Sequence, residues 1–375
     1  MKKVFLIDPQ ARNKGSLAVY DYSLFSPMRK ADYTFYGNSD FGLEKKFGNL
    51  KFVGLFHYQK YNGIVRGLSY TWSMIMLLLK IIIKRPNTIH VEWIRLWSVD
   101  YIIYSLIKIL ARPKMVYTVH NVLPHEAQSV DINRYRKLYG LMDILIVHTD
   151  ASKNDLMSLS PEIRPEAIKV IPHGILQLSI NKDKVIEEMK RMESKYDLHD
   201  KIVFAIVGTQ SKYKGTDLLL SAWNNCPQLS DNNKIVLLSI GRFEDDVVPF
   251  NPADNVIVIN RIVSDEEFVA SIRLASVIVL PYRRIDQSGV LMTCINEGTP
   301  YCSTDVGELC KPIDYAGVGW KISTPTIEEI ENTLLYLINN EDVINERKNN
   351  IKAWNKARSL YDWGEISKTT EQLYV

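Results

Sequence analysis

The strongest indication of the fold is the stretch Ala205-Ile-Val-Gly208-Thr-Gln-Ser-Lys212-Tyr-Lys214-Gly215-Thr-Asp-Leu-Leu-Leu220. An apolar run ends at Gly208, a polar loop holds two lysines, and a helical run begins after Gly215. This order is typical of parallel α/β sheets, in which ligands bind at the carboxyl ends of the strands. Lysines beside a helix N-terminus suit phosphate oxygens, although solvated lysines in a plain connecting loop give the same pattern.

The same order recurs in Val277-Ile-Val-Leu-Pro281-Tyr-Arg-Arg-Ile-Asp-Gln-Ser288-Gly289-Val290-Leu291. An apolar run ends at Pro281, and a polar loop leads into a helix near Ser288 and Gly289. We expect the backbone N–H groups of Ser288, Gly289 and Val290 to point at a diphosphate, because glycine permits close approach. Two loops suited to phosphate in one domain are harder to dismiss than either loop alone.

A third loop precedes the capping box formed by Ser264 and Glu267, which predicts a helix start. The backbone at 261–263 is then free to face a planar base. The predicted donor-binding residues are Gly208, Lys212, Lys214, Arg261, Ile262, Val263, Gln287, Ser288, Gly289 and Val290.

Apolar strand-like runs alternate with amphipathic helical runs along all 375 residues, which are too many for one ordinary core. Strands are predicted at 3–7, 51–54, 88–91, 115–118, 144–148, 169–171, 202–207, 234–240, 256–259, 277–280 and 300–303. Helices are predicted at 152–159, 216–225, 265–275 and 327–339, among others. A break after His173-Gly174 gives domains of residues 1–175 and 176–349, followed by a helical segment, 350–375.

The cysteines and the N-terminus indicate the compartment. Four cysteines, Cys226, Cys294, Cys302 and Cys310, lack zinc-ligand spacing and fit a reducing environment. The first apolar run stops at Asp8, so a strand is favoured over a signal peptide. We expect a cytoplasmic protein.

The net charge of +3 hides an asymmetry. Residues 1–175 hold 24 Lys and Arg against 14 Asp and Glu, whereas the remainder holds 22 against 29. One face is therefore expected to meet an anionic partner. No nucleic-acid-binding motif accompanies the charge, so a membrane surface is favoured.

Two apolar helical stretches in the basic half, 66–84 and 101–110, carry lysines and arginines at their ends. Both are suited to cover a sheet as core helices. Their apolar surface and basic rim also suit an anionic bilayer, as in interfacial helices. We therefore expect peripheral membrane contact, and the alternative is that both helices serve only as core helices.

In order and spacing, these segments resemble the group 1 (family 4) glycosyltransferases. The matching elements are Val207-Gly208 with Lys214-Gly215, residues 261–267, Pro281, Gly298-x-Pro300, 304–307, and more loosely 117–121, 147–149 with Ser152, and 170–174. The resemblance implies the GT-B fold: two Rossmann-like doubly wound α/β domains facing a central cleft, with a C-terminal helix crossing back to the first. It implies donor binding in the second domain and acceptor binding in the first.

The chain departs from the family pattern in its charges. Thr209 follows Gly208 where the family has Arg, and Ile285 and Thr293 occupy the positions of two glutamates. Asp286 and Glu297 lie near those positions without being equivalent. We therefore expect the chain to belong to a divergent branch of this family, and the donor is not inferred from the family.

The first half supplies the candidate catalytic residues. The family places a histidine, here His120, near the donor sugar, although a strand-end histidine is also satisfied by backbone contacts. His125 or Glu126 is the candidate base if the enzyme inverts, with helix capping as the alternative. The acceptor side is predicted to include Gly15, Ser16, Glu92 and Trp93, although core burial of the tryptophan is as natural.

The sequence thus predicts a hexosyltransferase using a UDP- or GDP-sugar. No Asp-x-Asp pair ends a strand, so neither a metal nor any other cofactor is expected, and lysines and helix N-termini offset the diphosphate charge. The acceptor is predicted to be a saccharide or lipid-linked saccharide in bacterial surface polysaccharide or glycan synthesis, at the inner face of the membrane. The alternatives are a nucleotide-sugar epimerase or phosphorylase, and a non-catalytic membrane-associated partner of a glycan assembly complex.

Overall fold

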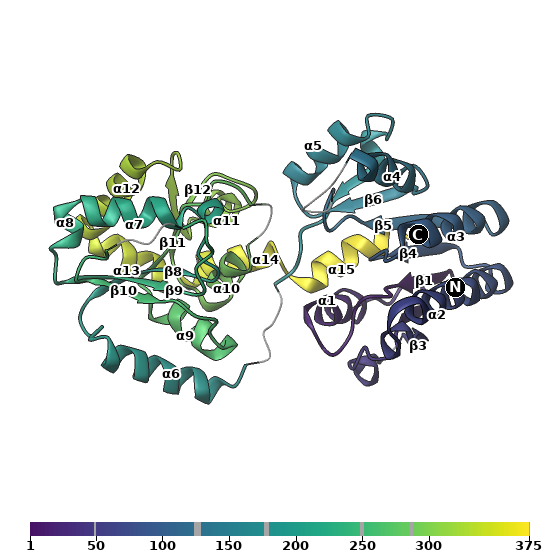
Figure 1. Ribbon diagram of the computed structural model, residues 1–375, viewed down its shortest axis with the longest axis horizontal. Helices are drawn as coiled ribbons and strands as arrows, with labels where there is room; N and C mark the ends of the chain where they lie inside the picture. The colour runs from purple at the N-terminus through teal and green to yellow at the C-terminus, as the bar shows by residue number, and fades with distance from the viewer. Residues whose placement is uncertain (49, 124–128, 176–179, 248–250, 286–287, 375) are drawn as a thin grey trace. The chain divides into compact units, whose positions relative to one another are not determined.

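The computed structural model describes residues 1–48, 50–123, 129–175, 180–247, 251–285 and 288–374. The chain forms two compact units. Unit 1 consists of Met1–Leu176 with Tyr361–Val375, and unit 2 of Gln177–Leu360. Each unit is an α/β structure built on its own parallel sheet (Figure 1).

Unit 1 contains a seven-stranded parallel sheet in the order β3-β2-β1-β4-β5-β6-β7. The strands are β1 (Lys3–Ile7), β2 (Asp32–Asn38), β3 (Lys51–Phe56), β4 (Thr88–Val91), β5 (Lys114–Thr118), β6 (Ile144–Val147) and β7 (Ile168–Val170). All residues of β4 and β6 are buried, as expected for parallel strands covered on both faces. The direction in which strands are added reverses between β1 and β4, so ligand-binding loops are expected there.

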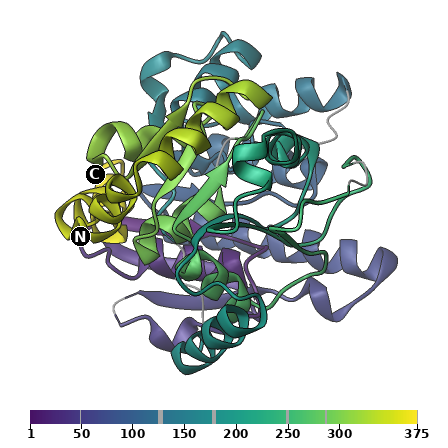
Figure 2. The same ribbon diagram turned by 90° about the vertical axis from the view of Figure 1, so that its left-hand side faces the viewer.

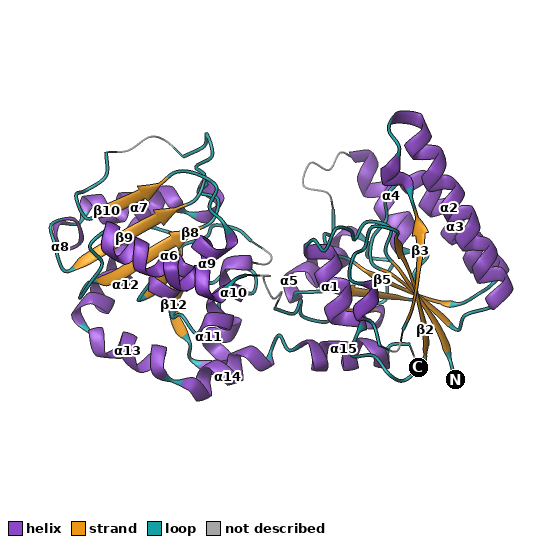
Figure 3. Ribbon diagram, turned by 90° about the horizontal axis from the view of Figure 1, so that it is seen from below, coloured by secondary structure: helices purple, strands orange, loops and turns teal. Residues whose placement is uncertain are grey.

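Helices cover both faces of this sheet (Figure 3). The helices of unit 1 are α1 (Ser16–Phe25), α2 (Gly63–Lys84), α3 (Trp97–Leu110), α4 (Ser129–Tyr139), α5 (Asp150–Leu159) and α15 (Trp363–Gln372). One core contains residues of α2, α3, α4 and α5, and the other contains residues of α1 and α15. Figure 2 shows the two ends of the chain close together, and Thr88 Oγ1 donates to the Tyr374 carbonyl at 3.2 Å.

Unit 2 has a six-stranded parallel sheet in the order β10-β9-β8-β11-β12-β13. The strands are β8 (Ile202–Val207), β9 (Ile235–Ile240), β10 (Val256–Ile259), β11 (Val277–Leu280), β12 (Tyr301–Thr304) and β13 (Gly319–Ile322). The helices are α6 (Lys182–Lys195), α7 (Thr216–Asn225), α8 (Pro227–Ser230), α9 (Asp265–Leu274), α10 (Gly289–Glu297), α11 (Lys311–Ala316), α12 (Ile327–Asn339), α13 (Glu341–Asn349) and α14 (Ile351–Ser359). Its strand order reverses between β8 and β11.

The predicted α/β class and the two doubly wound sheets are confirmed, and two strands were missed. In β2, the sequence Asp-Tyr-Thr-Phe-Tyr-Gly-Asn is aromatic and polar rather than a continuous apolar run. In β13, exposed Lys321 separates buried Trp320 from buried Ile322 in a strand of only four residues. Both strands are recognisable once their neighbours pair with them.

The C-terminal segment 350–375, predicted as one element, is divided between the two units. Helix α14 contacts α10 and α11 and belongs to unit 2, whereas α15 contacts α1 and belongs to unit 1. The division falls at Leu360 and Tyr361, between the two helices. Only α15 therefore returns to the first sheet.

A buried carboxylate fixes α15 to unit 1. Glu371 Oε1 accepts hydrogen bonds from the N–H groups of Arg29 (2.6 Å) and Lys30 (2.5 Å) and from the Tyr33 hydroxyl (2.6 Å). Replacing Glu371 with Ala leaves the buried Tyr33 hydroxyl and the two part-buried N–H groups without this acceptor, and we expect the free energy of unfolding to fall by about 1–3 kcal/mol.

Glu365 of the same helix is the matched control, because its carboxylate is exposed and pairs only with Lys368 at 3.3 Å. Glu365→Ala is expected to change stability by less than about 0.5 kcal/mol. Equal losses for the two variants in urea denaturation would show that Glu371 does not hold the helix.

Candidate active site

The loop after β8 is fixed by buried contacts of its own. Gly208 has a φ of 97°, in the region that favours glycine. The Gln210 side-chain amide donates to the carbonyls of Gly208 (2.8 Å) and Ile240 (3.0 Å). Its oxygen accepts from Thr216 Oγ1 at 3.1 Å, which ties the loop to the start of α7. The loop is therefore preformed without a ligand.

The loops after β8 and β11 lie against each other. Gly215 has a φ of 69°, and a Cβ atom there would lie 2.0 Å from the carbonyl oxygen of Pro281. Only glycine permits this approach. Arg283, in the second loop, holds the carboxylate of Asp217 with two hydrogen bonds of 2.6 and 2.8 Å. Sequence reasoning missed this ion pair, because the partners are 66 residues apart.

Three predicted donor-binding residues meet at one point. A Cβ atom on Gly208 would lie 3.3 Å from Lys214 Nζ and 3.7 Å from Val290 Cγ2. Burial lowers the pKa of Lys214, and the negative charge of Glu244 partly offsets that effect. The partly desolvated ammonium is thus placed where an anion gains most from it.

The start of α10 presents a second positive feature. Ser288 is buried and caps the helix, since its Oγ accepts from the Leu291 N–H at 3.3 Å. The first N–H groups of a helix have no partner within the helix, and a Cβ atom on Gly289 would meet nothing within 4 Å. Gln287 lies outside the described residues.

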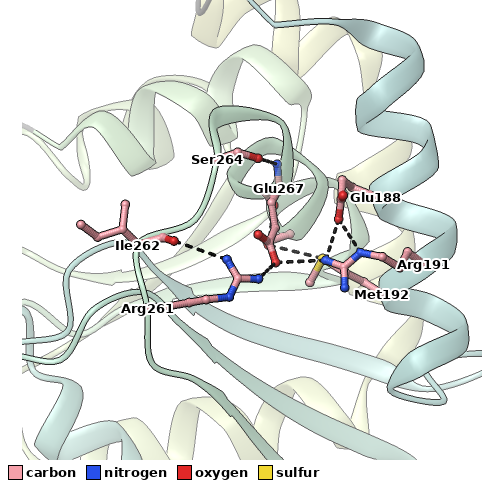
Figure 4. Close-up of polar contacts among 8 residues, drawn as sticks. Glu188, Arg191, Met192, Arg261, Ile262, Ser264 and Glu267 are labelled. Atoms are coloured by element: carbon pink, nitrogen blue, oxygen red, sulfur yellow. Dashed lines mark hydrogen bonds and ion pairs between the residues drawn. The ribbon is translucent and has the colours of Figure 1, made fainter.

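The loop at 261–263 follows β10, at the edge of the sheet (Figure 4). The Arg261 guanidinium donates to Glu267 Oε1 at 2.6 Å, and Arg191 approaches the same oxygen at 3.2 Å. Ser264 Oγ caps α9 as predicted, but the Glu267 carboxylate binds these two arginines instead. Ile262 is 78% exposed, and Val263 is half-buried. Strand β9 separates this loop from the Lys214 loop.

The other predicted and substituted positions of unit 2 are spread more widely. Lys212 is exposed, and its N–H donates to Asp246 Oδ2 at 3.1 Å. Glu297 pairs with Arg273 at 2.7 Å, at the far end of α10 from Ser288. Glu297 therefore does not replace the glutamates that the family resemblance implied.

Unit 1 has a buried chain of side chains at the carboxyl ends of β4, β5 and β6. Glu92 Oε2 lies 3.0 Å from His120 Nε2, and His120 Nδ1 lies 3.3 Å from His148 Nε2. The other nitrogen of His148 lies 2.9 Å from the Ile171 carbonyl oxygen. Trp93 stacks on the His120 ring, with centroids 4.4 Å apart. Three predicted residues, Glu92, Trp93 and His120, are thus brought together.

The hydrogen-bond directions in this chain follow from its last acceptor. The Ile171 carbonyl can only accept, so His148 carries its hydrogen on Nδ1 and, when neutral, accepts at Nε2. His120 then donates from Nδ1 and, when neutral, accepts at Nε2. The proton between His120 and Glu92 therefore belongs to the carboxyl group. Burial favours this arrangement, because it raises the pKa of Glu92 and lowers that of His120 to about 3.

A pair of buried acids lies in the same unit. Asp8, after β1, accepts from the N–H groups of Gln10 (2.5 Å) and Ala11 (3.1 Å), and the buried Asp21 of α1 influences its pKa. Burial raises the pKa of Asp8 to about 7. Burial and the charges of Asp8 and Glu92 raise the pKa of Asp21 further, so Asp21 holds the proton at neutral pH.

The remaining predicted residues of unit 1 lie on loops. Gly15 is the N-cap of α1 and Ser16 its first residue, and both are exposed after β1. His125 and Glu126 lie outside the described residues. No group of three or more His, Cys, Asp or Glu side chains suited to a metal occurs within the described ranges.

A surface hollow of about 780 Å³ in unit 2 is lined by residues that include Lys201, Asn232 and Asn255. Lys201 precedes β8 and Asn255 precedes β10, so the hollow lies at the amino ends of the strands. Ligands of open α/β sheets bind at the opposite ends, where the Lys214 loop lies. We therefore place the candidate site at the Lys214 loop.

Comparisons with known proteins agree with this arrangement. Residues 31–175 match the sequence model of Glycosyltransferase Family 4. No curated protein matches the chain by sequence. A structure of HepE from Anabaena in complex with UDP has a TM-score of 0.68 at 14% identity, covering 100% of this chain and 99% of that one.

Two synthases share the same fold. Sucrose-phosphate synthase from Thermosynechococcus elongatus has a TM-score of 0.64 at 14% identity, with 100% and 98% of the two chains covered. Trehalose 6-phosphate synthase from Burkholderia multivorans has a TM-score of 0.63 at 11% identity, with 99% and 96% covered.

The chain therefore shares the GT-B fold with these enzymes, and its residues 31–175 are similar to Glycosyltransferase Family 4. The predicted resemblance to the group 1 (family 4) glycosyltransferases is confirmed, with the sequence match lying in residues 31–175 of unit 1.

The buried acids predict a pH dependence of stability. Asp8 ionises near its ordinary pKa of 3.8 in the unfolded chain but near 7 in the fold, so the folded state binds more protons between these values. The contribution of Asp8 to the free energy of unfolding therefore falls as pH rises from about 4 to about 7. Asp8→Asn removes this dependence and should gain up to about 3 kcal/mol relative to the parent between pH 5 and pH 7.

Urea denaturation at several pH values measures this difference. The exposed Asp32, the first residue of β2, provides the control Asp32→Asn, whose stability should remain parallel to that of the parent. A constant difference between Asp8→Asn and the parent over this pH range would contradict the assignment.

Proposed function

We propose that the protein transfers a hexose from a UDP- or GDP-sugar to a saccharide or lipid-linked saccharide in bacterial surface polysaccharide or glycan synthesis. The reaction takes place in the cytoplasm, at the inner face of the cell membrane, and without a metal. The observation that carries the proposal is the meeting of Gly208, Lys214 and Val290 at the strand-order reversal of unit 2. UDP is the first nucleotide to test, because HepE was solved with UDP and with UDP-glucose.

The leaving group explains the placement of these residues. An acceptor hydroxyl oxygen forms a bond to the anomeric carbon while the bond from that carbon to the diphosphate oxygen breaks, and the hydroxyl proton leaves with a base or with the phosphate. Negative charge then grows on the diphosphate. Lys214 and the first N–H groups of α10 supply positive charge there, and the missing side chain of Gly208 leaves room for phosphate oxygens.

The acceptor side of the proposal rests on unit 1. Both ring nitrogens of His120 are hydrogen-bonded to Glu92 and His148, so His120 positions rather than removes a proton. His125 or Glu126 remains our candidate base for an inverting reaction. Trp93, stacked on His120, is our candidate for contact with a sugar ring.

The test is thermal stability with UDP, GDP, ADP and their sugar conjugates, first with a chelator and then with magnesium. A nucleotide at 100 times its dissociation constant stabilises the folded protein by about 2.7 kcal/mol, which gives a clear shift of the melting temperature. We expect Lys214→Ala to abolish the shift and to lower turnover more than about tenfold, since it removes a charge-assisted contact with phosphate. The matched control is Lys234→Ala, because Lys234 lies just before β9, at the amino ends of the strands and so opposite the candidate site.

Three results would count against the proposal. A shift that requires magnesium would contradict metal independence, and conversion of a nucleotide-sugar without an acceptor would favour an epimerase. No shift with any nucleotide, with an intact fold, would favour the non-catalytic partner of a glycan assembly complex.

A further inference from the structure

Helix α2 carries a continuous apolar stripe on the side away from its core. Ile64, Leu68, Trp72, Ile75, Leu79 and Ile83 are exposed and follow one another at helical spacings of three or four residues. Ile64 is 82% exposed and Trp72 is 63% exposed. The stripe runs along most of a helix of 22 residues, about 33 Å in length.

The opposite side of α2 is fully packed. Tyr70, Met74, Leu77 and Ile81 have no exposed surface and belong to the core of unit 1. Within the described residues, α2 is the one helix long and apolar enough to cross a bilayer. Crossing would pull these four side chains out of the core, so the helix is suited to lie on a bilayer rather than to span it.

Helix α3 extends the stripe into a two-helix surface. Its exposed apolar residues are Ile102, Leu106, Ile109 and Leu110, whereas Ile103, Tyr104 and Ile107 are buried in the same core as α2. The two helices lie side by side on one face of the sheet (Figure 3). Arg85, after α2, donates to the Leu110 carbonyl at 2.7 Å, so the C-terminal ends of both helices are adjacent. We call these ten exposed residues the α2–α3 surface.

The charges around this surface are mainly basic, although the part-exposed Asp143 pairs with Lys108 at 3.0 Å. Asp100 is the single acidic residue of the two helices; it is buried and accepts from the Tyr70 hydroxyl at 2.5 Å. Basic residues gather at the adjacent C-terminal ends and just beyond them; they are Lys80, Lys84, Arg85, Lys108, Arg112 and Lys114. An anionic partner is therefore complementary to the surface.

A lipid bilayer fits both properties better than a second copy of the chain. A second copy would present the same basic charge, whereas anionic headgroups neutralise it. The stripe has the length and the apolar character of an interfacial helix, and Trp72 lies near its middle. A protein partner needs polar contacts at its rim, whereas the exposed faces of α2 and α3 offer mainly aliphatic side chains.

We propose that the α2–α3 surface docks on an anionic bilayer, with α2 parallel to the membrane and its C-terminal lysines on the headgroups. The evidence for docking is the α2–α3 surface itself. Its benefit, the delivery of a lipid-linked acceptor to unit 1, rests on the proposed function.

The experiment is flotation of the full-length protein with vesicles of phosphatidylcholine alone or mixed with phosphatidylglycerol, at low and high salt. We expect binding to the mixed vesicles, weakened by salt. Leu68→Gln with Trp72→Gln should lower the partition coefficient more than about tenfold, because both side chains lose apolar contact with the acyl boundary. Lys80→Gln with Lys84→Gln should also lower it more than about tenfold, through lost charge.

Unit 2 offers matched controls. Tyr336→Gln with Ile351→Gln removes exposed apolar side chains, and Lys352→Gln with Lys356→Gln removes a lysine pair with the same spacing on α14. Neither control should change binding by more than about twofold, since surface substitutions away from an interface have small effects. Circular dichroism and melting temperature verify that every variant is folded.

The outcomes are distinct. Equal vesicle binding by the parent and by Leu68→Gln with Trp72→Gln would overturn the proposal. The proposal would also be overturned if the parent formed a dimer in light scattering that only this variant dissociates, and if the parent did not bind the mixed vesicles. The nucleotide-induced melting shift should be the same in this variant and the parent. Absence of this melting shift in both the variant and the parent, with vesicle binding by the parent intact, would count against the transferase function but not against the docking surface.

Discussion

The close backbone contacts at two glycines determine the site of unit 2. A Cβ atom on Gly241 would lie 1.9 Å from the Gly208 carbonyl oxygen, and one on Gly215 would lie 2.0 Å from that of Pro281. These contacts bring the ends of β8, β9 and β11 together at the point where the strand order reverses. The N-terminus of α10 and Lys214 both lie beside Gly208, where a Cβ atom would be 3.3 Å from Lys214 Nζ and 3.7 Å from Val290 Cγ2. The phosphate chemistry that we propose depends on this packing more than on any single charge.

Unit 1 differs from unit 2 in that it buries several ionisable groups close together. Asp8, Asp21 and Glu92 have almost no exposed surface, and His90, His120 and His148 lie among them. Burial disfavours each charged form, so it raises the pKa values of the three acids and lowers those of the three histidines. Neutral partners hydrogen-bond without the cost of a desolvated ion pair. The result is a rigid edge of the sheet beside Trp93 rather than a set of free bases.

The two faces of the first sheet have different tasks. Helices α1 and α15 close one face with aromatic and aliphatic contacts, and Glu371 holds the returning chain in place. Helices α2 and α3 close the other face but leave apolar residues outward, beside mainly basic ends. Each of these two helices therefore has apolar residues both on its packed side and on its outer side.

The class of fold, the positions of most strands, and the loops at Gly208 and Ser288 could be predicted from the sequence. Local patterns are sufficient for these features, because apolar runs, glycines and helix caps act within a few residues of each other. Strand β2 was missed because its aromatic and polar residues are recognisable only beside β1 and β3. Tertiary structure alone decided the Arg283–Asp217 pair, the division of the C-terminal segment, and the hydrogen-bonded chain from Glu92 to His148. These features join residues that are distant in the chain, and their protonation depends on burial, which only the packed structure sets.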